Sequence, residues 1–234
     1  MVAHNKQRGA PQERVPGIIF TTSTPSKLQQ CANSVLGLLD VVSSEKEEDR
    51  PNGSDSVSIS DAIARELEHL SRESKKFRFS GEVSRGIGLI TLPKNLIPSQ
   101  LVHDLLMSSL PVQPPMFLSR IIPIDFVSAP NLQSFENTML PVIKAAFDAL
   151  TTDVTWKVVL DKHGLTNITK ENLVDMLLAA IPERHEVSIH EPQIVVMVQV
   201  TQKTCGVALL KDYDALCEYN IRKLILQRAS IGTV

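Results

Sequence analysis

The residue types that most often carry catalysis or bind metals are sparse in this chain. It has six histidines and three cysteines in 234 residues, with no CxxC pair and no HExxH sequence. His185 and His190 lie close together in the acidic stretch ERHEVSIHEP, but on a strand a spacing of five sends two side chains to opposite faces. We therefore expect both to be solvated edge residues. We expect no metal site and no disulfide framework, since the number of cysteines is odd.

Phosphate-binding loops and activated nucleophiles are also missing. The two glycines of SRGIGLI, Gly86 and Gly88, lead into a predicted strand, whereas a nucleotide-binding glycine loop opens a helix. No GxSxG sequence occurs, and no nucleophile has a base suggested by its spacing. The sequence therefore predicts a protein that is not an enzyme and that needs no cofactor of its own.

The charge balance limits a further chemistry, the binding of nucleic acid by cations. The chain has 24 Lys and Arg against 26 Asp and Glu, a formal net charge of -2. A general nucleic-acid binder shows a basic excess, so an RNA site here has to be a local patch. The polar N-terminus has no signal-peptide core, and no apolar run approaches the ~20 residues of a membrane span. We expect an intracellular protein without a membrane partner, in the nucleus or nucleolus, with the cytoplasm as the alternative.

Hydrophobic spacing predicts the elements that would position such a patch. The first half contains a short strand, a helix that opens at Pro25, a solvated insertion, a second helix, another strand and a third helix. Their ranges are 17–22, 25–39, 43–55, 58–74, 81–92 and 98–110. A stiff Pro-rich hinge, PVQPP (111–115), follows. This order predicts a small mixed α/β domain that ends before the hinge.

The second half begins with an extended stretch at 116–129, followed by a long helical pattern that Pro141 should kink or split. A strand at 153–160 and a helix capped by Thr169 come next, and then three strand-like runs. One of them, QIVVMVQV (193–200), is almost wholly apolar. Such a strand is buried on both faces, so the pattern predicts helices packed on a sheet with this strand in its interior.

Several segments in this order resemble the THUMP-domain adaptor proteins of tRNA cytidine acetylation. In the second half the resemblance is carried by SRIIPIDF (119–126), WKVVLDKHGLTNITKENLVDMLLAAI (156–181) and VSIHEPQIVVMVQVTQKTCGVALLKDYDALCEYNIRKL (187–224). In the first half it is carried by GIIFTT, DAIARELEHL and RGIGLITL. The resemblance covers most of 16–224.

The resemblance implies an α+β fold in two units. A disordered tail (1–15) would precede a ferredoxin-like mixed domain (16–110) with a disordered insertion near 43–57. The hinge (111–115), a THUMP domain (116–225) and a tail (226–234) would follow. It also implies a non-catalytic helper that binds the acceptor end of tRNA. The helper would present the D-arm to a separate RNA cytidine acetyltransferase, and that partner would use acetyl-CoA and ATP. The alternative is a protein-interaction scaffold of an RNA-modification complex, with little RNA binding of its own.

Five polar residues on the predicted loops are the candidates for contact with RNA, because RNA affinity comes largely from cations that meet phosphates. They are Arg120, Lys162, His163, Asn167 and Lys203. Each could instead be an ordinary solvated side chain without a role in binding, and Arg120 could pair with a carboxylate. The family usually has a basic residue where Asp161 stands, an Arg near His163, and asparagines at Gly164 and Leu165. We therefore expect weak or partner-dependent tRNA binding, which Asp161→Lys should tighten.

Overall fold

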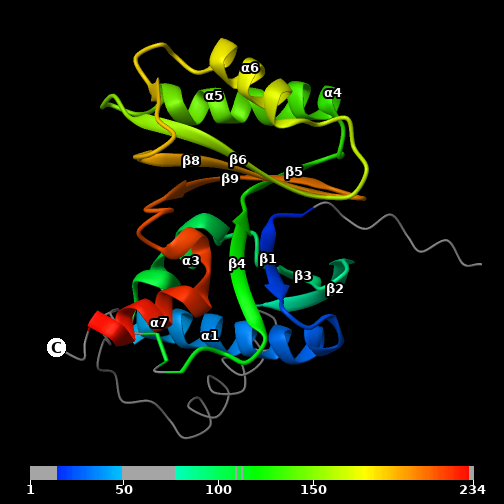
Figure 1. Ribbon diagram of the computed structural model, residues 1–234, viewed down its shortest axis with the longest axis vertical. Coiled ribbons are helices and arrows are strands. Elements are labelled where there is room, and N and C mark those ends of the chain that lie inside the picture. The colour runs from blue at the N-terminus through cyan, green and yellow to red at the C-terminus, as the bar shows by residue number, and fades with distance from the viewer. Residues whose placement is uncertain (1–14, 49–76, 109, 112, 232–234) are drawn as a thin grey trace, which may run out of the picture.

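The computed structural model describes residues 15–48, 77–108, 110–111 and 113–231, and it arranges them around two β-sheets (Figure 1). A four-stranded sheet has the order β2-β3-β1-β4, and a five-stranded sheet has the order β5-β9-β8-β6-β7. The predicted α+β class is confirmed. The predicted tail at 1–15, apart from its last residue, and the predicted helix at 58–74 lie outside the described residues.

The four-stranded half has the order βαββαβ. Its elements are β1 (Gly17–Thr22), α1 (Leu28–Glu48), β2 (Arg78–Ser84), β3 (Ile87–Thr91), α3 (Pro98–Met107) and β4 (Leu118–Ile124). All its strand pairs are antiparallel. This element order with this strand order is the ferredoxin-like arrangement. The single strand predicted at 81–92 is instead a hairpin, because Gly86 turns the chain at a φ of 75°.

Strand β4 completes this first sheet, although the sequence assigned 116–129 to the second unit. Its partner is β1, with Gly17 opposite Ile124 and Phe20 opposite Ile121. An apolar strand carries no local signal for which of two sheets it joins, because its partner here lies about a hundred residues away in the sequence. The extended stretch therefore divides, and only β5 (Phe126–Ser128) enters the second sheet.

Helices α1 and α3 cover one face of this sheet. The alternate strand residues Ile18, Phe20 and Ile90 are fully buried against apolar residues of the helices. Pro25 begins a short 3-10 turn, η1 (Pro25–Lys27), directly before α1. Residues 43–48, which we expected in a solvated insertion, continue α1 to Glu48. Glu and Lys are good helix formers, so the helix extends beyond its last apolar residue.

The five-stranded half contains β5, β6 (Thr155–His163), β7 (Glu186–Val187), β8 (Ile194–Thr201) and β9 (Cys205–Lys211). Strand β6 runs parallel to β7 and β8, whereas β9 is antiparallel to β8 and β5. One face is covered by α4 (Leu132–Ser134), η2 (Phe135–Met139), α5 (Leu140–Asp148) and α6 (Lys170–Ala180). Figure 1 shows these helices on the side away from the four-stranded half.

Two sequence signals set the helices of this layer. The long helix is interrupted as predicted: the π-helical turn η2 ends at Met139, and Pro141 lies in the first turn of α5. Proline has no N–H to donate to the preceding turn, and the widened π-helical turn lies directly before it. Thr169 caps α6 as predicted, since its side chain accepts a hydrogen bond from the Asn172 N–H.

Strand β8 joins the two cores, which explains its almost wholly apolar sequence. Val196 and Val198 face the helices α5 and α6, whereas Val195 and Met197 belong to the core of the four-stranded half. At Gly206 of β9 an added Cβ would lie 2.6 Å from Ile124 Cγ2. The neighbouring sheets approach closely there, so glycine is required.

The chain then returns to the first half. A turn, η3 (Cys217–Tyr219), leads into α7 (Ile221–Ile231), whose Leu224 and Ile225 are buried in the first core. Helix α7 packs against β4 of the four-stranded sheet. The tail predicted at 226–234 is therefore helical as far as Ile231, because Arg228 donates hydrogen bonds to the Leu106 and Ser108 carbonyls at the end of α3.

Candidate nucleic-acid interface

The parallel pairing of β6 and β8 brings four of the five predicted residues to one end of the second sheet. Lys162 lies opposite Val200 and His163 opposite Thr201. Lys203 lies in the hairpin that follows β8, and Asn167 lies in the loop that follows β6. Both connections leave from the same ends of neighbouring parallel strands, so they meet at one edge. We call this edge, residues 161–169 with 201–205, the loop edge.

The two parts of the loop edge contact each other at Gly164. Its φ is 149°, and an added Cβ would lie 3.0 Å from the Gln202 Cγ. The φ and the close approach both favour glycine. The asparagine that the family usually has here would be strained at this φ and would need the Gln202 side chain to shift, so this departure from the family pattern fits the observed loop.

Lys162 and Asn167 hold the loop in place with their own side chains. The Lys162 Nζ donates to the carbonyls of Thr166 and Ile168, at 3.0 and 3.3 Å. The Asn167 Oδ1 accepts a hydrogen bond from the Leu132 N–H at the start of α4. The neighbouring Leu165 side chain is fully exposed, with a relative accessibility of 102%. The loop edge thus presents an apolar side chain on a loop braced by hydrogen bonds.

Asp161 is part of a polar cluster on the opposite face of β6. Its Oδ2 accepts a hydrogen bond of 3.0 Å from the Gln199 Nε2, and its Oδ1 lies 2.8 Å from the His163 Nε2. Gln199 is only 1% exposed, so its amide depends on this carboxylate. Sequence reasoning treated Asp161 as a charge that repels phosphate and missed Gln199, because only the β6–β8 register places the two side by side.

This cluster changes what Asp161→Lys would do. The substitution would add a positive charge, but it would also take away the hydrogen-bond acceptor of a buried amide. A gain in tRNA affinity would be accompanied by a loss of stability. Asp161→Asn is the cleaner change, because the asparagine Oδ1 can still accept from Gln199.

Arg120 lies outside the loop edge. It is on β4 of the other sheet, and its Nη2 lies 2.7 Å from the Glu218 Oε2. Glu218 stands in the turn between β9 and α7. The interpretation that Arg120 pairs with a carboxylate, left open by the sequence, describes what the structure shows. The charge of this arginine is therefore largely balanced within the protein.

Lys203 is the predicted cation with the most available charge. Its backbone N–H donates to the Thr201 Oγ1 at 3.3 Å, which helps to close the hairpin. Its side chain is exposed, and within the described ranges it forms no ion pair. Among the five predicted residues, it is the one whose charge a phosphate would meet without displacing an internal partner.

His185 is buried, which corrects the expectation of a solvated edge residue. It is 4% exposed, and its Nδ1 accepts a hydrogen bond from the Val154 N–H at 3.2 Å. Nδ1 must then be the unprotonated nitrogen, so Nε2 donates to the Phe147 carbonyl, also at 3.2 Å. His185 therefore ties α5 to β6 and has a structural role. His190 is exposed as expected.

Other chemistry is limited within the part of the chain that the structure describes. No cluster of three or more His, Cys, Asp or Glu residues there could hold a metal ion. Burial raises the pKa of the Cys205 thiol to about 12, so this thiol stays protonated and is a poor nucleophile. None of the described helices is long and apolar enough to cross a membrane.

Comparison with known protein families identifies one domain of the chain. Residues 129–210 match the family model of the THUMP domain, so the chain contains a THUMP domain. This match includes β6, α6, β8 and both parts of the loop edge. No curated protein matches the chain.

Solved structures with a similar course of the chain include three that are each 12% identical to it. PH1313 from Pyrococcus horikoshii Ot3 has a TM-score of 0.47, and the match covers 84% of this chain and 55% of that one. A 4-thiouridine synthetase in complex with RNA and ATP has a TM-score of 0.43, with 84% and 42% covered. TrmN from Thermus thermophilus has a TM-score of 0.34, with 82% and 45% covered. The chain thus spans about half the length of these proteins, and at such scores the likenesses carry no functional conclusion.

Proposed function

We propose that this protein is a tRNA-binding adaptor. It has no catalytic activity of its own, and it presents tRNA, held at the acceptor end, to a separate RNA cytidine acetyltransferase that acetylates a D-arm cytidine. The observation that carries the proposal is the THUMP domain at 129–210. The acetylation step depends on the wider resemblance of the sequence to the adaptor proteins of tRNA cytidine acetylation, which extends into the first half.

The loop edge supports RNA binding of modest strength. It offers the free cation of Lys203 and the exposed Leu165 on short loops that hydrogen bonds hold in place, and the partly engaged cation of Lys162 at the end of β6. Single-stranded ends are recognised by shape, apolar contact and phosphate contact. With so few free cations, affinity should be low for the isolated chain and higher when the acetyltransferase partner adds its own contacts.

The scaffold alternative has specific observations in its favour. The formal net charge is -2, Arg120 pairs with Glu218, and Asp161 places a carboxylate beside His163. A scaffold would need the protein partner but would not contact phosphate. The two functions therefore differ in the salt dependence of tRNA binding.

A salt titration of tRNA binding by the wild-type chain and by Lys203→Glu tests the proposal. Loss of one phosphate contact should weaken binding several-fold and lower the salt slope by about 0.9 for a duplex contact or about 0.7 for a single strand. Lys211→Glu is the matched control, because Lys211 is also exposed but ends β9 at the far end from the hairpin, roughly 25 Å away by strand rise. Binding of tRNA that is independent of salt, with and without the acetyltransferase, would favour the scaffold.

The adaptor role is tested separately by mass spectrometry of tRNA nucleosides from cells that lack the protein. We expect acetylcytidine to disappear from tRNA and to return with the wild-type gene. The isolated chain, given acetyl-CoA, ATP and tRNA, should form no product. Turnover by the isolated chain would contradict a non-catalytic role, and unchanged acetylcytidine in the deletion would contradict the link to acetylation.

A further inference from the structure

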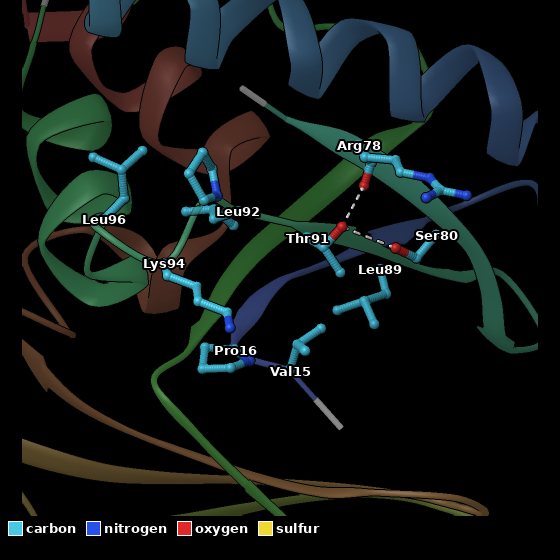
Figure 2. Close-up of a pocket in the computed structure, with 10 residues that line it drawn as sticks. Val15, Pro16, Arg78, Ser80, Leu89, Thr91, Leu92, Lys94 and Leu96 are labelled. Atoms are coloured by element: carbon cyan, nitrogen blue, oxygen red, sulfur yellow. Dashed lines mark hydrogen bonds between the residues drawn. The ribbon is translucent and has the colours of Figure 1, made fainter. Parts of the chain in front are cut away.

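A cavity opens on the four-stranded half, on the sheet face turned away from α1 and α3 (Figure 2). Its volume is about 660 Å³, which lies within the range of small-molecule sites. The floor comes from neighbouring positions of β2 and β3, since Arg78 lies opposite Thr91 in the ladder. The chain before β1 and the loop after β3 form the walls. None of the residues predicted to bind RNA lines this cavity.

Two cationic residues from different elements line the cavity. Arg78 is at the start of β2, and Lys94 is in the loop between β3 and α3. Both are exposed, and neither forms an ion pair with another described residue. Figure 2 shows the Lys94 amine beside Pro16 and the Arg78 guanidinium near Ser80, with Thr91 between them. The cavity therefore offers two positive charges at opposite sides to an anionic ligand.

Two hydrogen bonds fix the orientation of the Ser80 and Thr91 hydroxyls on the floor of the cavity. The Thr91 Oγ1 donates to the Arg78 carbonyl at 3.3 Å, and the Ser80 Oγ donates to the Thr91 Oγ1 at 3.1 Å. A carbonyl only accepts, so Thr91 uses its hydrogen there and must accept from Ser80. The Ser80 oxygen keeps its lone pairs free. It is thus ready to accept a hydrogen bond from a ligand hydroxyl or amine.

The remaining walls are apolar, and they include Pro16 and Leu89. A ligand that satisfies the whole site therefore needs an anionic group for the cations, a hydroxyl that donates to Ser80, and an apolar face. Inorganic phosphate lacks the apolar face. A simple carboxylic acid lacks the donor hydroxyl. A ribonucleotide has all three, in its phosphate, its ribose hydroxyls and its base.

We propose that this cavity binds one ribonucleotide unit, with the phosphate held by Lys94, a ribose hydroxyl donating to Ser80, the sugar and base packed against Pro16 and Leu89, and the charge of Arg78 at the opposite side. The inference goes beyond the proposed function, because it assigns a ligand to the half of the molecule that lies outside the THUMP match. Two sources carry this chemistry: a free nucleotide and the terminal nucleotide of an RNA chain.

Calorimetric or NMR titration of the full chain with adenosine and cytidine 5′-monophosphates tests the site. We expect saturable binding that falls at least ten-fold in the double variant Arg78→Glu/Lys94→Glu. Arg85→Glu is the matched control, because Arg85 is exposed in the turn of the same hairpin but does not line the cavity. It should leave binding unchanged. Circular dichroism of each variant checks that the fold is kept.

The ribose contact has its own test. Ser80→Ala should weaken binding of the ribonucleotide but not of the 2′,3′-dideoxynucleotide, which has no hydroxyl to donate. A loss of folding alone would affect both ligands equally. If inorganic phosphate binds as tightly as the nucleotides, the site is a plain anion site and the ribonucleotide assignment is wrong.

Short RNA oligonucleotides separate the two sources. If the terminal nucleotide of RNA occupies the cavity, an oligonucleotide should bind more tightly than the monophosphate and should compete with it. If a free nucleotide is the ligand, the monophosphate should bind more tightly. No saturable binding by either up to millimolar concentration overturns the proposal. Because Lys203→Glu tests tRNA binding at the loop edge, that function and this cavity can fail independently.

Discussion

The loop edge of the five-stranded half and the cavity of the four-stranded half differ in whether their cations are engaged by other groups of the protein. At the loop edge, Lys162 donates to two carbonyls of its own loop, and only Lys203 is left free. In the cavity, Arg78 and Lys94 line an open space without a carboxylate partner among the described residues. The loop edge, which holds four of the five predicted RNA-binding residues, thus uses most of its polar groups internally. The cavity of the four-stranded half keeps its two cations available.

This difference shows that a basic residue in a sequence does not by itself indicate a binding surface. A cation that holds a loop contributes to the shape of the surface, whereas a free cation contributes to affinity. Substitutions that remove one side chain from each class should separate stability from binding.

His185→Ala should give the largest loss of stability, because His185 is only 4% exposed and both of its ring nitrogens are hydrogen-bonded to backbone groups of other segments. The change leaves the Val154 N–H and the Phe147 carbonyl without partners and removes a ring packed edge-on against Phe147. We expect the free energy of unfolding to fall by about 3 kcal/mol, measured by urea denaturation.

The exposed His190→Ala is the control, with an expected change within about 0.5 kcal/mol. Equal losses in the two variants would show that the polar groups of this half are not internal ties. The contrast between the two halves would then fail.

Lys162→Met should mainly lower stability, whereas Lys203→Met should mainly weaken tRNA binding. Lys162→Met removes the donor to two loop carbonyls, so the free energy of unfolding should fall by about 1 kcal/mol. Lys203→Met should leave stability within about 0.5 kcal/mol and should weaken tRNA binding more than Lys162→Met does. Thermal melting and a tRNA binding assay on the same samples measure both. If the two variants lose affinity equally at unchanged stability, Lys162 is a phosphate contact and the division between the two classes of cation is wrong.

Asp125→Asn should give the smallest effect, and the effect depends on pH. Asp125 lies between β4 and β5, where its Oδ1 accepts from the Ser99 N–H at 2.8 Å. Burial raises the pKa of this carboxyl, and the hydrogen bonds from Ser99 only partly oppose the shift. A raised pKa means that the folded state favours the protonated form. The protonated Asp125 carboxyl therefore contributes its full stabilisation of the folded state below the pKa that it has in the unfolded chain. This contribution is lost as pH rises through the pKa that the carboxyl has in the folded state.

Asparagine keeps the acceptor and cannot ionise. At pH 7, Asp125→Asn should therefore leave stability equal or slightly raised, and this difference should shrink as pH falls through the raised pKa. Urea denaturation at several pH values measures the trend, with the exposed Asp175→Asn as the control. A stability advantage of the asparagine variant that grows on acidification would contradict the sign.

Local sequence signals were sufficient to predict most of the helices and strands and the nature of the second half. The apolar run of β8 indicated a strand buried on both faces, Thr169 fixed the start of α6, and Pro141 marked the interrupted helix. These signals are local, since the period of apolar residues, a cap and a missing N–H act within a few residues of the chain. The residues that carry the family resemblance lie in the same segments, which is why the THUMP domain could be recognised.

Only the tertiary structure decided which sheet β4 joins and which polar side chains are free. The pairing of β4 with β1, of Arg120 with Glu218 and of Asp161 with Gln199 each joins residues far apart in the sequence. His185 was read as exposed for the same reason, because its partners lie on α5 and at the start of β6. The interaction energy of a charged side chain depends on which groups lie within a few ångströms of it. Residue types and their spacing along the chain do not specify these distances.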